Sequence, residues 1–425
     1  MFNTARKTPM FDKIVKLFTK SPTEKAIALE ETWAAHNYAP LPVLLKRGDG
    51  VYVWDLEGKK YLDMMGAYSA VSHGHSHPRI IKKLIEQAQT LAMVSRAYHT
   101  MTLGPFMEKL CKVSGLDMAL PMNTGAEAVE TAIKAARQWG YLVKKIPENQ
   151  AEIIVASGNF HGRTTTIISF SSNPSYRKNF GPLTPGFKAV PFDDIEAIRA
   201  AITPNTCAVL MEPIQGEAGI KVPRKGFLSD LRRLCTEKNV LMIDDEVQAG
   251  LGRTGKMFCF QHENAKPDIL ILGKALGGGV LPVSAIVGTK EVMELFEPGS
   301  HGSTFGGNSL ASAVGLEAIN VIEEEGLVEN SAILGDYLLT QFRGLNSPLI
   351  TDVRGMGLWV GVEFDPKKVS ARTVCEKLIE KGVLSKETNN TVVRMAPPLI
   401  ITREQIDWCL AQFREALREL EEEVL

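Results

Sequence analysis

Three polar clusters follow apolar runs of the sequence, and their residue types suit one kind of chemistry. VLMIDDEVQAG places Asp244, Asp245 and Glu246 at the exit of one run. DILILGKALGGG places Lys274 directly after another, and ALPMNTGAEAVETAIKAARQ leads through residues 123–125 into a long helical pattern. If these runs are neighbouring parallel strands, ligands bind beyond their carboxyl ends, where a carboxylate, an amine and a helix N-terminus would come together.

The loop at residues 123–125 is a candidate anion site. Free N–H groups at a helix N-terminus, together with the helix dipole, favour a phosphate group. Gly125 allows the backbone to approach such a group closely. The same loop also suits a plain helix cap, because Thr124 is a preferred N-cap residue, so the loop alone does not decide between the two.

The other two clusters also have ordinary interpretations when each is taken alone. Lys274 could be a solvated surface charge, and the three acidic residues could form a metal site. The combination favours pyridoxal phosphate, which requires an anion site, a carboxylate that keeps its ring nitrogen protonated and an amine for its aldehyde. A lysine whose pKa is lowered can also move protons during the reaction. The three clusters together therefore predict a pyridoxal-phosphate enzyme.

The elements that must position these clusters alternate between strands and helices. The apolar runs AEIIVAS, TCAVLME, VLMIDDE and DILILG alternate with amphipathic segments such as AEAVETAIKAARQWGYLV and GFLSDLRRLCTEKN. Short apolar strands separated by helices predict a mainly parallel sheet that helices cover on both faces. The predicted fold class is therefore α/β.

Near the N-terminus, GDGVYVWDLEGKKYLDMM predicts a hairpin that turns at Glu57-Gly58. A helix is expected to begin at Pro78. Its spacing predicts a buried face made of Ile80, Ile81, Leu84, Ile85 and Ala88.

After about residue 327 the pattern changes to LVENSAILGDYLLTQF, LWVGVEF and ITREQIDWCLAQFREALREL, which predicts a smaller α+β lobe. We therefore expect three parts in the chain. Residues 1–60 form an N-terminal segment that packs with the small lobe, residues 61–326 form a large lobe, and residues 327–425 form the small lobe.

Composition excludes several classes of partner. The 425 residues carry a net charge of −1, which gives no electrostatic reason to expect nucleic acid or an acidic membrane. No apolar run approaches the roughly 20 residues that a membrane helix needs. The six cysteines are scattered without a C-x-x-C pair, which is typical of a reducing compartment.

The first 22 residues, MFNTARKTPMFDKIVKLFTKSP, are basic and amphipathic. They weakly resemble an organelle transit peptide, and a surface helix or arm is the preferred alternative. The expected location is cytoplasmic, with the mitochondrial matrix as the second possibility.

From about His36 to Pro398 the sequence resembles the class III (subgroup II) aminotransferases of fold type I, and most of all their ornithine-specific branch. The resemblance rests on HNYAPLPVLL, MGAYSAVSHGHSHP, PMNTGAEAVETAIKAAR, GNFHGRT, EPIQGEAG, DDEVQAGLGRTG, LGKALGGGVLPVSA, HGSTFGGN and VVRMAPPL. So many ordered matches make chance negligible. The family's fold implies a mainly parallel seven-stranded sheet in the large lobe and a smaller α+β lobe.

The resemblance implies roles for residues around the cofactor, pyridoxal 5'-phosphate. Lys274 resembles the Schiff-base lysine, and Asp245 resembles the partner of the pyridine nitrogen. The expected remaining contacts are Gln248 at the phenolic oxygen, Phe160 on the ring face, and the N–H groups of Gly125 and Ala126 at the phosphate. Ser303 and Thr304 resemble a loop that reaches the phosphate of the neighbouring subunit, which implies a homodimer with active sites at the interface.

The resemblance also implies substrate contacts. Arg163 resembles the arginine that binds a substrate carboxylate, for which a bidentate guanidinium group is suited. Arg394 resembles the arginine that receives the α-carboxylate of 2-oxoglutarate or glutamate, and Glu217 resembles its carboxylate partner. Tyr38 and Tyr68 match two tyrosines of the ornithine-specific branch, although each could otherwise pack in a core.

One position departs from that branch. His161 stands where the ornithine enzymes carry tryptophan, whereas other members of the subgroup have histidine there. The expected reaction is transfer of the δ-amino group of L-ornithine to 2-oxoglutarate, which yields glutamate and a semialdehyde that cyclises to pyrroline-5-carboxylate. The alternatives are the same chemistry on N-acetylornithine, 4-aminobutyrate or lysine, an aminomutase or racemase, and an inactive binding protein.

Two further motifs invite other readings. His73, His75 and His77 alternate in HGHSHP, but no carboxylate or cysteine accompanies them, so a structural loop is preferred to a metal site. GGGV and FGGN are rich in glycine, yet neither forms the strand–GxGxxG–helix unit of a dinucleotide-binding fold. A nicotinamide dehydrogenase is therefore not expected.

Overall fold

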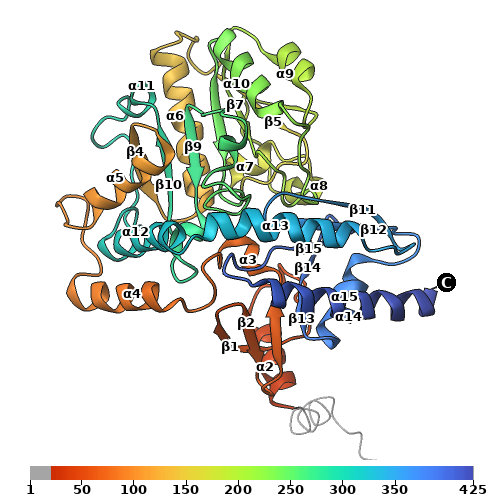
Figure 1. The fold of residues 1–425 in the computed structure, drawn as a ribbon. Helices are drawn as coiled ribbons and strands as arrows, with labels where there is room; N and C mark the ends of the chain where they lie inside the picture. Colours follow the sequence, from red (N-terminus) through yellow and green to blue (C-terminus); the bar gives the residue numbers. More distant parts are fainter. Residues whose placement is uncertain (1–20, 425) are drawn as a thin grey trace, which may run out of the picture.

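The computed structural model describes residues 21–424, and a seven-stranded sheet forms the middle layer of its larger, upper part in Figure 1. The strand order is β4-β10-β9-β8-β7-β5-β6. β10 runs antiparallel to both of its neighbours, and the remaining pairs are parallel. The predicted fold class is confirmed. The strands are β4 (Met118–Met122), β5 (Glu152–Ala156), β6 (Phe187–Val190), β7 (Thr206–Met211), β8 (Leu241–Asp245), β9 (Ile269–Leu272) and β10 (Ser284–Gly288).

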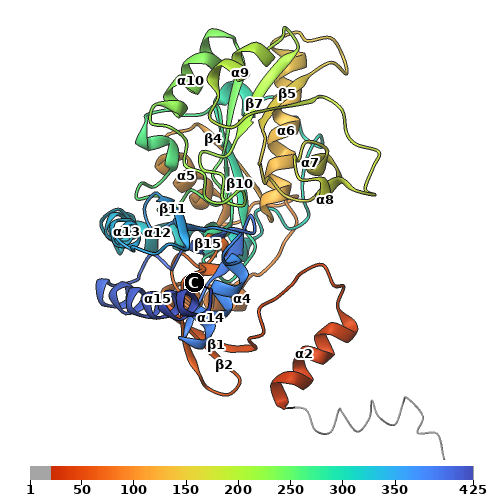
Figure 2. The same cartoon turned by 90° about the vertical axis from the view of Figure 1, so that its right-hand side faces the viewer.

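Helices cover both faces of this sheet, as its sequence pattern predicts. Every residue of β7, β8, β9 and β10 is buried. Successive side chains of β5 point to opposite faces: Ile153 and Val155 pack with α6 (Gly125–Leu142), whereas Ile154 and Ala156 pack with α9 (Ile195–Ala201) and α10 (Phe227–Glu237). Figure 2 shows α6 and α10 on opposite sides of the strands.

Further elements complete this part of the chain. They are α5 (Leu103–Ser114), α7 (Thr165–Ser169), α8 (Pro174–Arg177), η1 (Cys259–His262), η2 (Lys274–Gly277) and α11 (Lys290–Met293).

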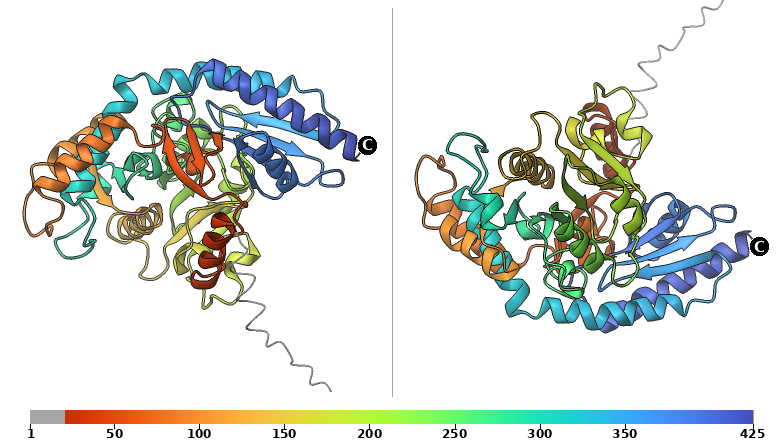
Figure 3. Two further views of the ribbon diagram at one scale, coloured as in Figure 1. Left: turned by 90° about the horizontal axis from the view of Figure 1, so that it is seen from below. Right: turned by 90° about the horizontal axis from the view of Figure 1, so that it is seen from above.

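The small lobe is built on a second, antiparallel sheet of order β11-β12-β15-β14. Helix α13 leads into it from α12, and α13 and α15 run side by side along its outer edge (Figure 3). Phe342 and Phe413 meet edge to face between these two helices, with ring centroids 4.9 Å apart. The elements are α12 (Ser309–Glu324), α13 (Leu327–Arg343), β11 (Ile350–Gly355), β12 (Val360–Phe364), α14 (Ala371–Glu380), β14 (Lys386–Thr388), β15 (Val392–Met395) and α15 (Arg403–Val424).

The N-terminal strands form a third sheet with a strand from the small lobe. β1 (Leu45–Asp49), β2 (Tyr52–Asp55) and β3 (Lys60–Asp63) are antiparallel, and β13 (Val383–Leu384) pairs parallel with β3. The predicted hairpin turn between β2 and β3 is confirmed. The lobe boundaries proposed from the sequence stay a prediction.

Helix α2 (Pro22–Trp33) contributes no buried residue and stands away from the body in Figure 2. The possible transit peptide falls largely on residues 1–20, outside the described residues. No helix within residues 21–424 is long and apolar enough to cross a bilayer.

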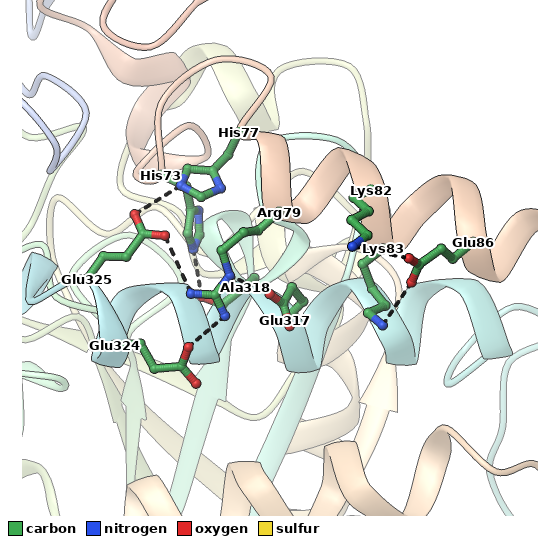
Figure 4. Close-up of polar contacts among 10 residues, drawn as sticks. All are labelled: His73, His77, Arg79, Lys82, Lys83, Glu86, Glu317, Ala318, Glu324 and Glu325. Carbon is green, nitrogen blue, oxygen red and sulfur yellow. Dashed lines mark hydrogen bonds and ion pairs between the residues drawn. The ribbon is translucent and has the colours of Figure 1, made fainter.

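Helix α4 (Pro78–Thr90) begins where the sequence predicts, but most of its predicted buried face is not buried. Ile80 is fully buried, Ile81 and Leu84 are half-buried, and Ile85 and Ala88 are exposed. The reason is that α4 packs mainly against one other helix, α12, which covers a single side of it. In Figure 4, the Arg79 side chain reaches from α4 to the carboxylates of Glu317 and Glu324 in α12 and of Glu325 just beyond its end. Its Nε lies 2.8 Å from Glu317. The apolar stripe continues beyond that contact into solvent.

The alternating histidines that precede α4 have separate structural partners. His73 bonds the Ala318 carbonyl oxygen through Nε2 at 2.9 Å, and His77 bonds Glu325 at 3.1 Å (Figure 4). His75 bonds Asp63 at 2.8 Å. The predicted structural loop therefore has a physical basis, since each imidazole fixes a different segment.

Arg253 joins the lobes from a fully buried position. Its Nη1 donates to the carbonyl oxygens of Leu358 at 2.8 Å and Pro397 at 2.7 Å, and its Nη2 donates to Ser72 Oγ at 3.1 Å. Because the three acceptors come from three distant stretches of chain, this one guanidinium group fixes how the small lobe meets the loops beyond β8.

Candidate active site

The three acidic residues at the exit of β8 do not converge on one point. Asp244 and Glu246 interact with each other, and Glu246 accepts the N–H groups of Cys259 at 2.6 Å and Phe260 at 2.8 Å. Asp245 lies on the opposite side of the strand, because side chains alternate. Within residues 21–424, no group of three or more potential ligands has the geometry to hold a metal ion. The metal interpretation of the acidic cluster therefore has no geometric support.

Asp245 has two fixed hydrogen-bond partners. Its Oδ2 lies 2.6 Å from His161 Nδ1, and its Oδ1 accepts the Val247 N–H at 3.1 Å. Only 5% of the Asp245 side chain is exposed. A carboxylate held by two donors in a buried position keeps its orientation.

Lys274 follows β9, the strand next to β8, and its backbone is left-handed with φ of +47°. Such a conformation is unfavourable for a residue other than glycine and is typical of functional sites. Burial lowers the pKa of Lys274 to about 8, against the opposing charges of Glu217 and Asp245. An amine with this pKa can exist in its neutral, nucleophilic form near neutral pH.

The loop at residues 123–125 is both a helix cap and a donor site. Thr124 Oγ1 accepts the Glu127 N–H at 3.2 Å, and Glu127 returns the bond to Thr124, which forms a capping box. This leaves the N–H groups of Gly125 and Ala126 without an acceptor in the described part of the chain. A Cβ atom on Gly125 would lie 3.1 Å from Val247 Cγ1, so the helix start packs tightly against the exit of β8.

Gln248 presents an unused donor to the same region. Its Nε2 is buried without a hydrogen-bond partner among the described residues. Its Oε1 packs closely against Gly216. A Cβ atom added to Gly216 would lie only 2.4 Å from this oxygen and 2.8 Å from the Trp359 ring. A buried amide donor without an acceptor carries a free-energy penalty. The site thus combines a free amine, an oriented carboxylate and unpaired donors, the set that pyridoxal phosphate can satisfy.

An aromatic and cationic cluster lies beside Asp245. The Phe160 N–H donates to Glu212 Oε2 at 2.8 Å. The Arg163 guanidinium lies 4.3 Å from the Tyr176 ring centroid and 5.8 Å from that of Phe160. The two rings meet edge to face at 6.1 Å. Because Arg163 is exposed, its guanidinium group is accessible to an incoming carboxylate.

A second arginine is buried and already paired. Arg394 Nη2 lies 2.7 Å from Glu217 Oε1, while Arg394 Nε and Nη1 are buried without partners among the described residues. Its Cζ lies 4.7 Å from the Tyr68 ring centroid. Tyr68 belongs to α3 (Gly66–Ser69), a turn in which all four residues have φ between +45° and +73°. This strained turn aims Tyr68 at the ion pair.

The remaining predicted residues lie at the edge of the cluster. Ser303 Oγ accepts the Asn123 amide at 2.8 Å, next to the start of α6 in the same chain, and Thr304 is exposed. Tyr38 is 74% exposed. These three residues are therefore less fixed by the single chain than the others.

Sequence reasoning missed Glu212 and Tyr176. Glu212 directly follows β7, so the same strand-exit argument that identified Lys274 could have found it. Tyr176 lies in the short helix α8, far from any predicted strand end, and the sequence offers no comparable signal for it.

The sequence profile described as aminotransferase class-III matches residues 33–417. An ornithine aminotransferase of Brevibacillus brevis is 54% identical over 93% of this chain and 99% of its own length. A second, from Halalkalibacterium halodurans, is 54% identical over 94% of this chain and 100% of its own.

Solved structures give the same result. An ornithine aminotransferase from Toxoplasma gondii, described as having pyridoxal phosphate at partial occupancy in its active site, has a TM-score of 0.94 at 42% identity and covers 99% of both chains. An acetylornithine aminotransferase from Elizabethkingia anophelis has a TM-score of 0.86 at 46% identity, and covers 94% of this chain and 100% of its own.

The Asp244–Glu246 pair predicts a pH dependence of stability. Burial and the neighbouring Glu246 raise the pKa of Asp244 well above its usual range, and burial raises that of Glu246 to about 7. The folded chain then binds more protons than the unfolded chain, so the pair's contribution to stability falls as pH rises from about 4 to about 7. The stability of Asp244→Asn relative to wild type should rise by about 1–2 kcal/mol between pH 5 and pH 8, because the variant has no carboxyl group to ionise at this position.

Denaturant midpoints measured between pH 5 and 8.5 check this expectation. Asp336→Asn, at an exposed position of α13, is the matched control and should follow wild type throughout. A constant difference in denaturant midpoint between Asp244→Asn and wild type across this range would contradict the raised pKa of the pair.

Proposed function

The chain belongs to the class-III aminotransferases, and from this premise we propose that it is an ornithine aminotransferase. Members of this family depend on pyridoxal phosphate and act on amino acids and oxo acids. The proposed reaction moves the δ-amino group of L-ornithine to 2-oxoglutarate. The products are glutamate and glutamate 5-semialdehyde, which cyclises to pyrroline-5-carboxylate. The observation that carries the proposal is the Arg394–Glu217 pair beneath Tyr68.

The proposed cofactor contacts follow from the donors and acceptors of the site. Lys274 would bond the aldehyde carbon, Asp245 would hold the proton of the ring nitrogen, and Gln248 would donate to the phenolic oxygen. Phe160 would cover the ring face, and the N–H groups of Gly125 and Ala126 would bind the phosphate. When bound, the cofactor supplies an electron-withdrawing ring that stabilises a carbanion at the carbon that bears the amine.

Lys274 has a second task once the substrate amine has replaced it. The neutral amine is then free to take a proton from that carbon and to return it elsewhere. Because burial lowers its pKa to about 8, the amine can both accept and release a proton near neutral pH. An ordinary surface lysine, with a pKa near 10.4, would remain almost wholly protonated there.

The two arginines suit the two ends of two different substrates. Ornithine must offer its δ-amine, so its α-carboxylate lies far from the ring, where the exposed fork of Arg163 can bind it. Tyr38 and Tyr68 would contact the same end of ornithine. 2-Oxoglutarate must offer its α-keto group, which brings a carboxylate close to the ring, where Arg394 can bind it.

Glu217 would decide which of these two modes is open. If it were unpaired, Arg394 would attract the α-carboxylate of ornithine and present the wrong amine to the cofactor. Paired with Glu217, Arg394 is neutralised during the ornithine half-reaction. Breaking a partly buried ion pair is costly unless another anion takes its place, and the α-carboxylate of 2-oxoglutarate is that anion. We infer that Glu217 is a specificity gate.

The alternative donors remain N-acetylornithine, 4-aminobutyrate and lysine. The acetylornithine aminotransferase from Elizabethkingia anophelis, at 46% identity, supports the first of these. An acetyl group on the α-amine removes one charge from the substrate but leaves the δ-amine and carboxylate in place. An amine-donor panel therefore separates these candidates more directly than any single contact does. A racemase, an aminomutase or an inactive binding protein is less consistent with the gate.

We further propose a homodimer, with Ser303 and Thr304 reaching the phosphate held by the partner. The uncovered stripe of α4 at Ile85 and Ala88, and Phe305, which is 58% exposed, supply apolar surface for such an interface. All six cysteines are free thiols, which supports a reducing, cytoplasmic location.

The first prediction tests the reaction. Purified protein should absorb visible light, and with ornithine and 2-oxoglutarate it should form a product that ortho-aminobenzaldehyde detects as pyrroline-5-carboxylate. Lys274→Ala should lose the wild-type visible band and turnover, because no other described amine shares its position. Lys266→Ala, at an exposed lysine before β9, is the control and should retain both. Turnover with 4-aminobutyrate or N-acetylornithine that exceeds turnover with ornithine would move the assignment to that donor.

The second prediction tests the gate. Glu217→Ala should keep the cofactor spectrum, speed the half-reaction with glutamate and weaken the preference for the δ-amine, so that the ratio of the two half-reaction rates shifts by about tenfold or more. Single-turnover spectra with ornithine and with glutamate measure that ratio. Glu419→Ala, which breaks an ion pair with Lys381 on the small lobe, should leave it unchanged. An unaltered ratio in Glu217→Ala would remove the gate.

The third prediction tests the shared site. Lys274→Ala and Thr304→Asp should each be inactive alone, the second because an anion would face the phosphate. Mixed under conditions of subunit exchange, they should recover about a quarter of wild-type activity, since half of the dimers are mixed and each has one intact site. No recovery, despite subunit exchange shown by differently tagged chains, would indicate a site within one chain.

A further inference from the structure

Three adjacent strands bring polar side chains to one buried point. β8, β7 and β5 are neighbours in the sheet. Asp245 is the last residue of β8, Glu212 directly follows β7, and His161 lies five residues beyond β5. All three side chains are buried. The strand order therefore brings two carboxyl groups and an imidazole together, although the outer two, His161 and Asp245, are 84 residues apart in the sequence.

The contact between His161 and Asp245 is short and shielded from water. His161 Nδ1 lies 2.6 Å from Asp245 Oδ2, and the exposed fractions of the two side chains are 0% and 5%. A carboxylate can only accept at this distance, so Nδ1 carries the proton and donates it. His161 Nε2 is buried and has no hydrogen-bond partner among the described residues. The imidazole is therefore committed to Asp245.

The peptide that carries His161 is anchored twice. The Phe160 N–H donates to Glu212 Oε2 at 2.8 Å, one residue before the bond from the imidazole to Asp245. The Phe160 ring, which would cover the cofactor, and the His161 imidazole, which holds Asp245, are thus fixed by the same short segment. A shift of this segment would move both together.

We propose that His161 is a positioning residue that holds Asp245 against the ring nitrogen of the cofactor and keeps the shared proton on that nitrogen. The inference rests on the proposed role of Asp245. The physical reason is that each hydrogen bond a carboxylate accepts lowers its basicity. Without the imidazole, Asp245 would keep only the Val247 N–H, and the proton between Asp245 and the ring nitrogen would move towards the carboxylate.

A purely structural role is the alternative, and His73 shows what such a role looks like. His73 is as deeply buried, but it bonds a backbone carbonyl, and burial lowers its pKa to about 4. Burial also acts to lower the pKa of His161, yet its bond to Asp245 and the charges of Asp245 and Glu212 raise it. The two histidines therefore share burial and differ in electrostatic surroundings, which makes His73 a matched control.

The test follows the proton on the ring nitrogen of the holoenzyme. Enzyme reconstituted with pyridoxal phosphate labelled with ¹⁵N in the ring is compared by NMR for wild type, His161→Leu, His161→Asn and His73→Leu. In His161→Leu the ¹⁵N shift should move towards the value of unprotonated pyridine, and the dissociation constant of the cofactor should rise about ten- to a hundredfold. His161→Asn, whose amide can donate from nearly the position of Nδ1, should restore the shift at least in part.

The control separates this effect from a loss of stability. His73→Leu should lower the melting temperature without moving the ¹⁵N shift. An unchanged ¹⁵N shift in His161→Leu, when Asp245→Asn does move it, would overturn the inference and leave the proposed function intact. If neither variant moves the shift, Asp245 is not the partner of the nitrogen, and the failure belongs to the proposed function.

A measurement on wild type keeps the proposal testable if His161→Leu does not fold. In holoenzyme labelled with ¹⁵N-histidine, the Nδ1 proton of His161 should resonate far downfield and exchange slowly with water, and His161→Asn should lack this signal. Absence of such a signal from the wild-type holoenzyme would overturn the inference.

Discussion

The alternation of side chains along one extended strand is the constraint on which the rest of the site depends. At the exit of β8 it separates three consecutive acidic residues, so that Glu246, with Asp244 on the same side, holds the start of η1 while Asp245 faces the site. The parallel neighbours of β8 end at the same edge of the sheet, which brings Lys274 and Glu212 next to that carboxylate. A slip of one residue in β8 would exchange the roles of these carboxylates. The fully buried strand, paired on both sides, resists such a slip.

The buried charged groups of this cluster are of two kinds, those in an ion pair and one without a partner among the residues described. Asp245 and Arg394 are paired, with His161 and Glu217 respectively, and a paired charge in a buried site is held in place. Lys274 has no ion pair within residues 21–424, and burial lowers its pKa to about 8. The paired groups are held in position to orient a ligand, whereas the unpaired amine can exchange its proton near neutral pH. The division between groups that position and a group that moves protons thus follows from the pairing.

The sequence predicted the elements well because their patterns are local. The runs that become β5, β7, β8 and β9, the start of α4 at Pro78 and the hairpin turn at Glu57-Gly58 all follow from periodicity and turn residues. The buried face of α4 was wrong at Ile85 and Ala88, since periodicity shows that a face is apolar and not what covers it. Resemblance supplied the candidate site residues, but the bond between His161 and Asp245 depends on strand order, and the stacking of Arg163 on Tyr176 depends on how a loop folds back.

Strained residues and unsatisfied donors occur where a ligand would be held. Lys274 and Tyr68 both have positive φ, and each such residue costs about 1–3 kcal/mol. Gln248 Nε2 and Arg394 Nε and Nη1 are buried without partners in the described chain. The surrounding sheet and the Arg253 bonds that join the lobes help to compensate for these costs. A ligand that accepts hydrogen bonds from these donors would stabilise the folded chain over the unfolded one. Binding at this site and the stability of the chain are therefore physically coupled.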